Sequence, residues 1–138
     1  MFQDSTEPPA VAPPQHMRLV FLSRVTRLKG VFEAIQLVQA LDKNSVAEHL
    51  DVFGPLLFDD PCDEKAFHEG LQKTGGLAHY AGLVEPANVI SLLRNYDCVR
   101  FPSTCDGEGF PGVIVESVFA GIPVIARDPM FLSLLWLL

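Results

Sequence analysis

The sequence predicts one α/β domain built on a doubly wound, parallel sheet of about five strands. Short apolar runs, typical of strands buried on both faces, alternate with longer segments of helical period. The connections between them are only a few residues long, which favours parallel strands joined by right-handed crossovers. A length of 138 residues, 49% of them hydrophobic, is enough for one core.

The first strand is expected at residues 18–23, a continuous apolar run, and the first helix at 31–41, where apolar residues recur every three or four positions. Asp60 followed by Pro61 is a favourable helix start, and Gly121 is expected to end the last helix. The other strands are expected at 50–53, 77–81, 97–101 and 122–126, and the other helices at 61–73, from 86 onward, and at 111–120.

The two ends of the chain differ from this pattern. Residues 1–17 are rich in proline and are expected to form an extended linker. Residues 129–138 are strongly apolar but too short to span a bilayer, and they resemble a truncated domain end. The folded domain is therefore predicted at residues 18–128. The acidic N-terminus without an apolar segment is unlike a signal peptide, so a cytoplasmic location is expected.

Composition and charge exclude several classes of function. A net charge of −7 and a pI of about 4.9 argue against a nucleic-acid-binding or anionic-membrane-binding surface. Cysteine spacing fits free thiols in a reducing compartment, and histidine spacing predicts surface or strand-end residues and no metal site. The residues in question are Cys62, Cys98 and Cys105, and His16, His49, His68 and His79.

A cationic loop follows the first strand at the carboxyl edge of the sheet, where ligands bind in such folds. Arg24, Arg27 and Lys29 fall within six residues, directly before a helix. A helix N-terminus favours anions, and added cations suit it to a diphosphate. The alternative is a basic loop that is simply solvated.

A glycine-rich loop follows the fourth strand and leads into a helix. It runs from Thr104 to Gly112, and its glycines let backbone N–H groups approach a ligand closely. Glu116 lies one turn into an otherwise apolar helix, where a carboxylate needs hydrogen-bond donors such as sugar or ribose hydroxyls. The alternative is that Glu116 faces solvent and the glycines only form a turn.

The segment Glu108-Gly-Phe-Pro-Gly-Val-Ile-Val-Glu116, followed by Ala120-Gly-Ile-Pro-Val-Ile-Ala126, closely resembles the family 4 (group 1) retaining glycosyltransferases of the GT-B architecture. Ser23-Arg24 with Lys29-Gly30 is similar to the other signature of that family. The resemblance covers about residues 18–128 and implies the C-terminal, Rossmann-like donor-binding domain.

The resemblance implies roles for individual residues. Arg24 and Lys29 would hold the donor diphosphate, and Glu116 would bind the ribose. Glu108 would contact the transferred sugar together with backbone N–H groups of the loop, and the residues after the third strand would lie near the nucleobase. The implied donor-binding residues are Gly82, Leu83, Gly109, Phe110, Gly112 and Glu116, and the implied catalytic residues are Arg24, Lys29 and Glu108.

The resemblance also implies the reaction and the partners. The donor is a nucleotide-diphosphate sugar, the acceptor a polysaccharide or glycoconjugate, and no metal or other cofactor is required. The acceptor-binding domain is not in this sequence, and the full enzyme could associate peripherally with a membrane. Two alternatives remain: a non-catalytic nucleotide-sugar-binding module or inactive fragment, and an unrelated doubly wound regulatory domain that binds a partner protein.

Overall fold

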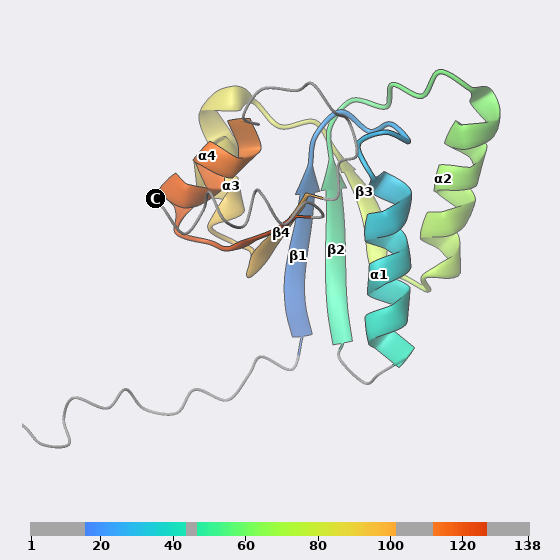
Figure 1. Ribbon diagram of the computed structural model, residues 1–138, viewed down its shortest axis with the longest axis horizontal. Helices are drawn as coiled ribbons and strands as arrows, with labels where there is room; N and C mark the ends of the chain where they lie inside the picture. The colour runs from blue at the N-terminus through green and yellow to red at the C-terminus, as the bar shows by residue number, and fades with distance from the viewer. Residues whose placement is uncertain (1–15, 44–46, 102–111, 127–138) are drawn as a thin grey trace, which may run out of the picture.

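The protein forms a single parallel sheet covered by helices on both faces. A computed structural model describes residues 16–43, 47–101 and 112–126. All strand pairs are parallel, in the order β3-β2-β1-β4-β5. Figure 1 shows α1 and α2 on one side of the sheet and α3 and α4 on the other. The predicted doubly wound sheet of five strands is therefore confirmed.

The elements in chain order are β1 (His16–Leu22), α1 (Val31–Lys43), β2 (Ala47–Phe53), α2 (Pro61–Lys73), β3 (Ala78–Gly82), the 3₁₀ turn η2 (Pro86–Asn88), α3 (Val89–Leu93), β4 (Cys98–Phe101), α4 (Gly112–Ala120) and β5 (Val124–Ala126). The first two strands are longer than predicted, and pair from His16 with Ala47 to Leu22 with Phe53. The extra length of β2 was missed because the prediction relied on continuous apolar runs, whereas the strand begins with Ala47, Glu48 and His49, two of which are polar. The predicted linker of residues 1–17 therefore overlaps β1 at its last two positions.

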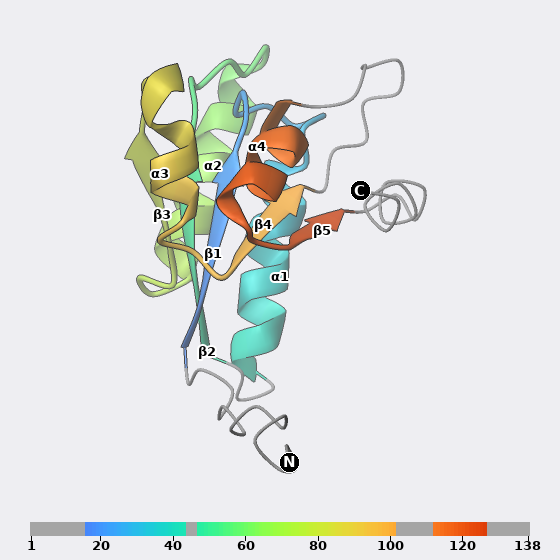
Figure 2. The same ribbon diagram turned by 90° about the vertical axis from the view of Figure 1, so that its left-hand side faces the viewer.

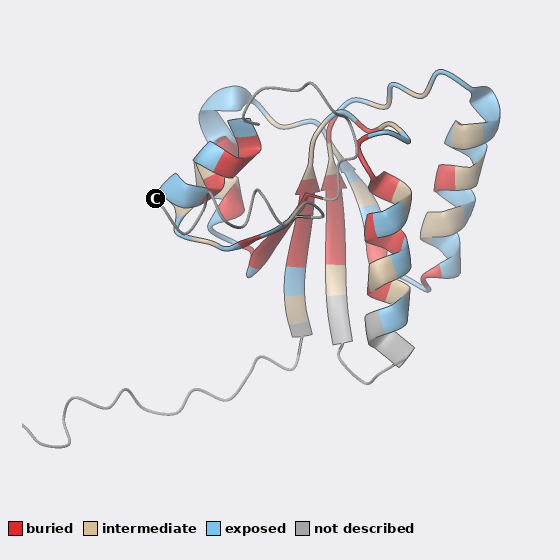
Figure 3. Cartoon of the chain, viewed as in Figure 1, coloured by how far each residue is buried: buried red, intermediate tan, exposed pale blue. Residues whose placement is uncertain are grey.

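Two apolar cores lie on opposite faces of the sheet. Leu19 and Phe21 of β1 pack into a core with α1 and α2. Val20, between them in sequence, packs into a second core with α3 and α4. Successive side chains of a strand point to opposite faces, so a run of apolar residues feeds both cores. Figure 3 shows the buried residues concentrated in the strands and on the inner sides of the helices.

Helix α2 begins and ends with side-chain hydrogen bonds. The Asp60 carboxylate accepts from the backbone N–H of Cys62 at 2.8 Å, and Pro61 occupies the first turn, as predicted. At the other end, the buried Thr74 hydroxyl donates to the carbonyl of Leu71 and accepts from the N–H of Ala78. Thr74 thereby fixes the start of β3 relative to the end of α2.

The helix predicted from Pro86 onward is divided into two parts. A 3₁₀ turn covers Pro86–Asn88, and α3 proper has only five residues. Among the described residues no side chain caps either start, and the Asn95 amide donates to the carbonyls of Ser91 and Leu92 at the end of α3. In the described part of the chain, no helix is long and apolar enough to cross a bilayer.

Candidate functional site

A cavity of about 570 Å³ lies at the carboxyl edge of the sheet. It opens beside the ends of β1 and β4, the neighbouring strands from which the chain winds in opposite directions. This topological switch point is the usual ligand site of doubly wound sheets. The volume falls within the range of about 300–1,000 Å³ that is typical of small-molecule sites. The lining residues are Leu22, Ser23, Lys29, Gly54, Pro55, Leu83, Val84, Pro86, Val89, Phe101, Gly112, Val113 and Glu116.

Backbone contacts fix the loop after β1 against the loop after β2. Val25 pairs with Leu56 in an isolated parallel bridge, the N–H of Val25 donates to the carbonyl of Pro55 at 2.9 Å, and Leu57 donates back to Val25 at 3.1 Å. Gly54 has a φ of +136°, and a Cβ there would lie 1.7 Å from the carbonyl oxygen of Ser23. Only glycine can therefore occupy this position without moving the loop.

Lys29 is the cation that the fold brings into the cavity. It is only 8% exposed, and its backbone N–H donates to the Thr26 hydroxyl at 3.2 Å, one turn before α1. A buried lysine is uncommon because its ammonium loses hydration, and anions offset that loss. The nearby N-terminus of α1 adds to the positive potential there. Lys29 thus places a buried positive charge at this cavity.

Arg24 and Arg27, the other two cations of the loop, lie outside the set of residues that line this cavity. Arg24 is exposed and lines a second cavity of about 370 Å³, which shares Lys29 with the first. Arg27 forms an ion pair with Asp63 at 2.7 Å and lies over the ring of Phe32 at 4.6 Å. The hydrogen bond from Arg27 lowers the pKa of Asp63. The sequence analysis grouped the three cations, but the structure assigns Arg27 to a bond with α2.

Glu116 of α4 lines the same cavity as the loop after β1. It is partly buried, and desolvation by burial raises the pKa of its carboxyl. Gly112, one turn earlier, also lines the cavity, and a Cβ on it would lie 3.8 Å from Oε1 of Glu116. Glu116 therefore lies at the cavity wall with a partly desolvated carboxyl.

The residues after β3 complete an apolar wall. Leu83 is 73% exposed yet lines the cavity, and Val84 lies beside it. Gly82, with a φ of +93°, turns the chain at the end of β3, and its carbonyl accepts from the N–H of Gly54 at 2.9 Å. Gly82 is not itself among the lining residues and acts through this turn.

The structure therefore brings some, but not all, of the predicted site residues to one cavity. The fold brings Lys29, Leu83, Gly112 and Glu116 to one cavity, whereas Arg24 lies on the adjoining one. Glu108, Gly109 and Phe110 lie outside the described residues. The sequence analysis missed the apolar lining from Leu22, Pro55, Val89 and Phe101. Each of these residues ends or follows a strand, or begins a helix, at the carboxyl edge of the sheet. That position is the signal that could have identified them from the sequence.

A family model described as glycosyl transferases group 1 matches residues 4–133. The chain belongs to the group 1 glycosyltransferases. A comparison with curated proteins found no match. Its fold is that of the C-terminal, Rossmann-like domain of GT-B glycosyltransferases.

Three solved structures illustrate the likeness. HepE of Anabaena in complex with UDP-glucose is 26% identical, with a TM-score of 0.65 over 80% of this chain and 29% of HepE. HepE in complex with UDP is 28% identical, with a TM-score of 0.64 over 81% of this chain and 30% of HepE. The C-terminal domain of LpcC from Francisella tularensis is 23% identical, with a TM-score of 0.67 over 80% of this chain and 57% of that chain, and supports the fold. The chain thus spans less than a third of the length of HepE.

Proposed function

We propose that this group 1 glycosyltransferase chain binds a nucleoside-diphosphate sugar in the cavity between Lys29 and Glu116, as the donor-binding half of a family 4 retaining enzyme. One observation carries the proposal. A buried cation and a desolvated carboxylate line the same cavity at the topological switch point of the sheet. The 26% identical HepE structure, which contains UDP-glucose, supports the ligand class.

Lys29 is proposed to hold the donor diphosphate. An ammonium beside a helix N-terminus stabilises phosphate oxygens through its charge and through the free N–H groups. Transfer breaks the bond between the anomeric carbon and a diphosphate oxygen, and the diphosphate leaves with the electron pair. A fixed cation stabilises that developing charge more than the neutral bond. Arg24 is proposed to assist from the adjoining cavity.

Glu116 is proposed to accept hydrogen bonds from the ribose hydroxyls. Its carboxylate has lost part of its hydration, so hydroxyl donors are more favourable here than in water. Leu83, beside the turn at Gly82, offers an apolar surface for the nucleobase. By the family resemblance, Glu108 and the backbone of Gly109, Phe110 and Gly112 would contact the sugar.

The proposed reaction keeps the configuration of the anomeric carbon. In the front-face mechanism described for this family, the acceptor hydroxyl attacks from the side of the leaving group and passes its proton to the departing phosphate oxygen. No protein nucleophile is needed. The acceptor, proposed to be a polysaccharide or glycoconjugate, would be held by an acceptor-binding domain, in the same protein or in a partner chain.

Isothermal titration with UDP, ADP, GDP and their sugar conjugates tests the binding proposal. Lys29→Ala should weaken binding of the preferred diphosphate about 10- to 150-fold, as expected for one hydrogen bond to a charged group of about 1.5–3 kcal/mol. Binding of the parent nucleoside should change little. The matched control is Lys65→Ala, because Lys65 is exposed on α2 and makes only a 4.0 Å ion pair with Glu69.

Glu116→Gln should weaken binding of the nucleoside as well, since the ribose is common to both ligands. Glu69→Gln on α2 is its control. The proposal fails if the unmodified chain binds no nucleotide at millimolar concentration, or if Lys65→Ala weakens binding as much as Lys29→Ala does.

A further inference from the structure

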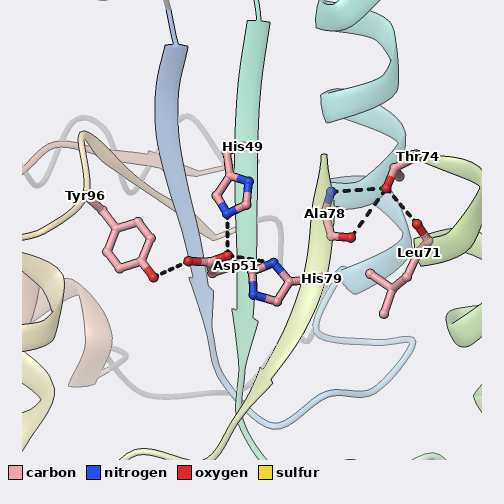
Figure 4. Close-up of polar contacts among 7 residues, drawn as sticks. All are labelled: His49, Asp51, Leu71, Thr74, Ala78, His79 and Tyr96. Carbon is pink, nitrogen blue, oxygen red and sulfur yellow. Dashed lines mark hydrogen bonds and ion pairs between the residues drawn. The ribbon is translucent and has the colours of Figure 1, made fainter. Parts of the chain in front are cut away.

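A second polar cluster lies on the sheet itself, away from the cavity. His49 and Asp51 are alternate residues of β2, so their side chains share a face. His79 of β3 is the register partner of Asp51. Figure 4 shows both imidazoles and the Tyr96 hydroxyl directed at the Asp51 carboxylate. The histidine spacing in the sequence predicted no metal site, because His49 and His79 are 30 positions apart in the chain and meet only through strand pairing.

The cluster converges on one oxygen. Nε2 of His49 lies 2.6 Å from Oδ1 of Asp51, and Nδ1 of His79 lies 3.0 Å from the same oxygen. All three ligand atoms lie within 4.8 Å of one another. The Asp51 side chain is 9% exposed, whereas those of His49 and His79 are 35% and 54% exposed. One side of the cluster therefore faces the protein and the other faces water.

Tyr96 holds the other carboxylate oxygen. Its hydroxyl donates to Oδ2 of Asp51. The guanidinium of Arg18 lies 5.0 Å from the centre of the Tyr96 ring. Carboxylates that bind metals are usually held by a further hydrogen bond, and Tyr96 supplies such a bond to Asp51.

We propose that His49, Asp51 and His79 bind a divalent transition-metal ion of the Zn²⁺ type, with water in the remaining coordination position. Two imidazole nitrogens and one carboxylate oxygen suit Zn²⁺ or Co²⁺, whereas Mg²⁺ and Ca²⁺ prefer all-oxygen sites. Bonds of about 2.0–2.1 Å place tetrahedral ligand atoms roughly 3.3 Å apart. The partly exposed side chains of His49 and His79 can both move away from Asp51 to reach that spacing.

The site is structural and not part of the proposed sugar transfer. The cavity residue Gly54 directly follows β2 and lies three residues after Asp51, roughly 10 Å away at about 3.3 Å per residue. A bound ion would join β2 to β3 directly, and join both to the turn before β4 through Tyr96. It would therefore stabilise the folded state without entering the cavity.

Thermal unfolding of the full, tag-free chain with added Zn²⁺ tests the proposal. Cys62 and Cys105 are replaced by serine in every sample, so that thiols do not bind the ion. Zn²⁺ should raise the Tm in a saturable manner, Mg²⁺ should not, and Co²⁺ should give the visible absorption of a tetrahedral site. His79→Ala should abolish both the Zn²⁺ shift and the Co²⁺ absorption, while His68→Ala, an exposed histidine on α2, should retain them.

Tyr96→Phe should keep the fold and weaken Zn²⁺ binding several-fold. His49→Gln provides a second ligand variant whose unfolding without metal can be compared with that of the parent chain. The proposal is overturned if Zn²⁺ gives no saturable shift, if the shift survives in both ligand variants, or if His68→Ala removes it.

Discussion

Asp51 and Glu116 are two acidic side chains that the fold removes from water in different ways. Asp51 lies in the middle of β2, and the protein supplies its hydrogen-bond donors from Tyr96 and two histidines. Glu116 lies at the carboxyl edge, and burial is the cause that raises the pKa of its carboxyl. An acid satisfied by the protein stabilises the sheet, whereas an acid desolvated at a cavity is suited to receive donors from a ligand.

Gly54 directly follows β2, the strand of Asp51, and lines the same cavity as Glu116. Its replacement should have the largest effect on stability. Gly54→Ala should lower the free energy of unfolding by about 2–6 kcal/mol, because backbone strain and overpacking each cost about 1–3 kcal/mol. The clash is with the Ser23 carbonyl, so nucleotide binding should fall as well. Gly82→Ala, whose Cβ would meet nothing within 4 Å, is the control for the strain alone. Equal losses in urea unfolding of the two variants would contradict the close-approach argument.

Removal of Asp51 should have a smaller but clear effect in metal-free buffer. Asp51→Ala should cost about 1–3 kcal/mol, because the buried Tyr96 hydroxyl loses its acceptor. The double variant Asp51→Ala/Tyr96→Phe should be less destabilised than the sum of the single variants. Urea unfolding of all three measures the coupling. Strict additivity would show that the hydrogen bond contributes nothing to the stability of the sheet.

Glu116→Gln should have the smallest effect on stability, and of the opposite sign. A carboxyl whose pKa is raised on folding binds its proton more tightly in the folded state. Its stability contribution is therefore complete below its ordinary pKa and is lost as the pH rises through the raised value. Without ligand, the glutamine variant should be slightly more stable than the parent at neutral pH, and the difference should vanish in acid. A loss of stability at neutral pH would mean that Glu116 has protein partners, as Asp51 does.

The sequence predicted the fold because the fold depends on local patterns. Apolar runs, the Asp60-Pro61 start and the glycine at 121 are visible without any tertiary contact, and they indicate the strand and helix order directly. The division of the segment from Pro86 onward into a 3₁₀ turn and α3 was missed, because no local pattern in the sequence separates the two kinds of helix.

Only those residues of the candidate site that belong to sequence motifs were predicted. Lys29 and Glu116 belong to recognisable segments, and the structure brings both to one cavity. The separate position of Arg24, the ion pair of Arg27 and the cluster around Asp51 depend on strand register and helix packing. Such contacts join residues that are distant in the chain, so no local sequence pattern indicates them.

The central claim is the location of the nucleotide, and a residue-resolved NMR titration of the ¹⁵N-labelled chain with UDP tests it most directly. The amide signals of Lys29, Gly54, Leu83 and Glu116 should shift together with one affinity, while those of His68 and Glu69 on α2 should stay in place. Shifts that are absent, or that cluster on α2 or around Asp51 instead, would contradict it.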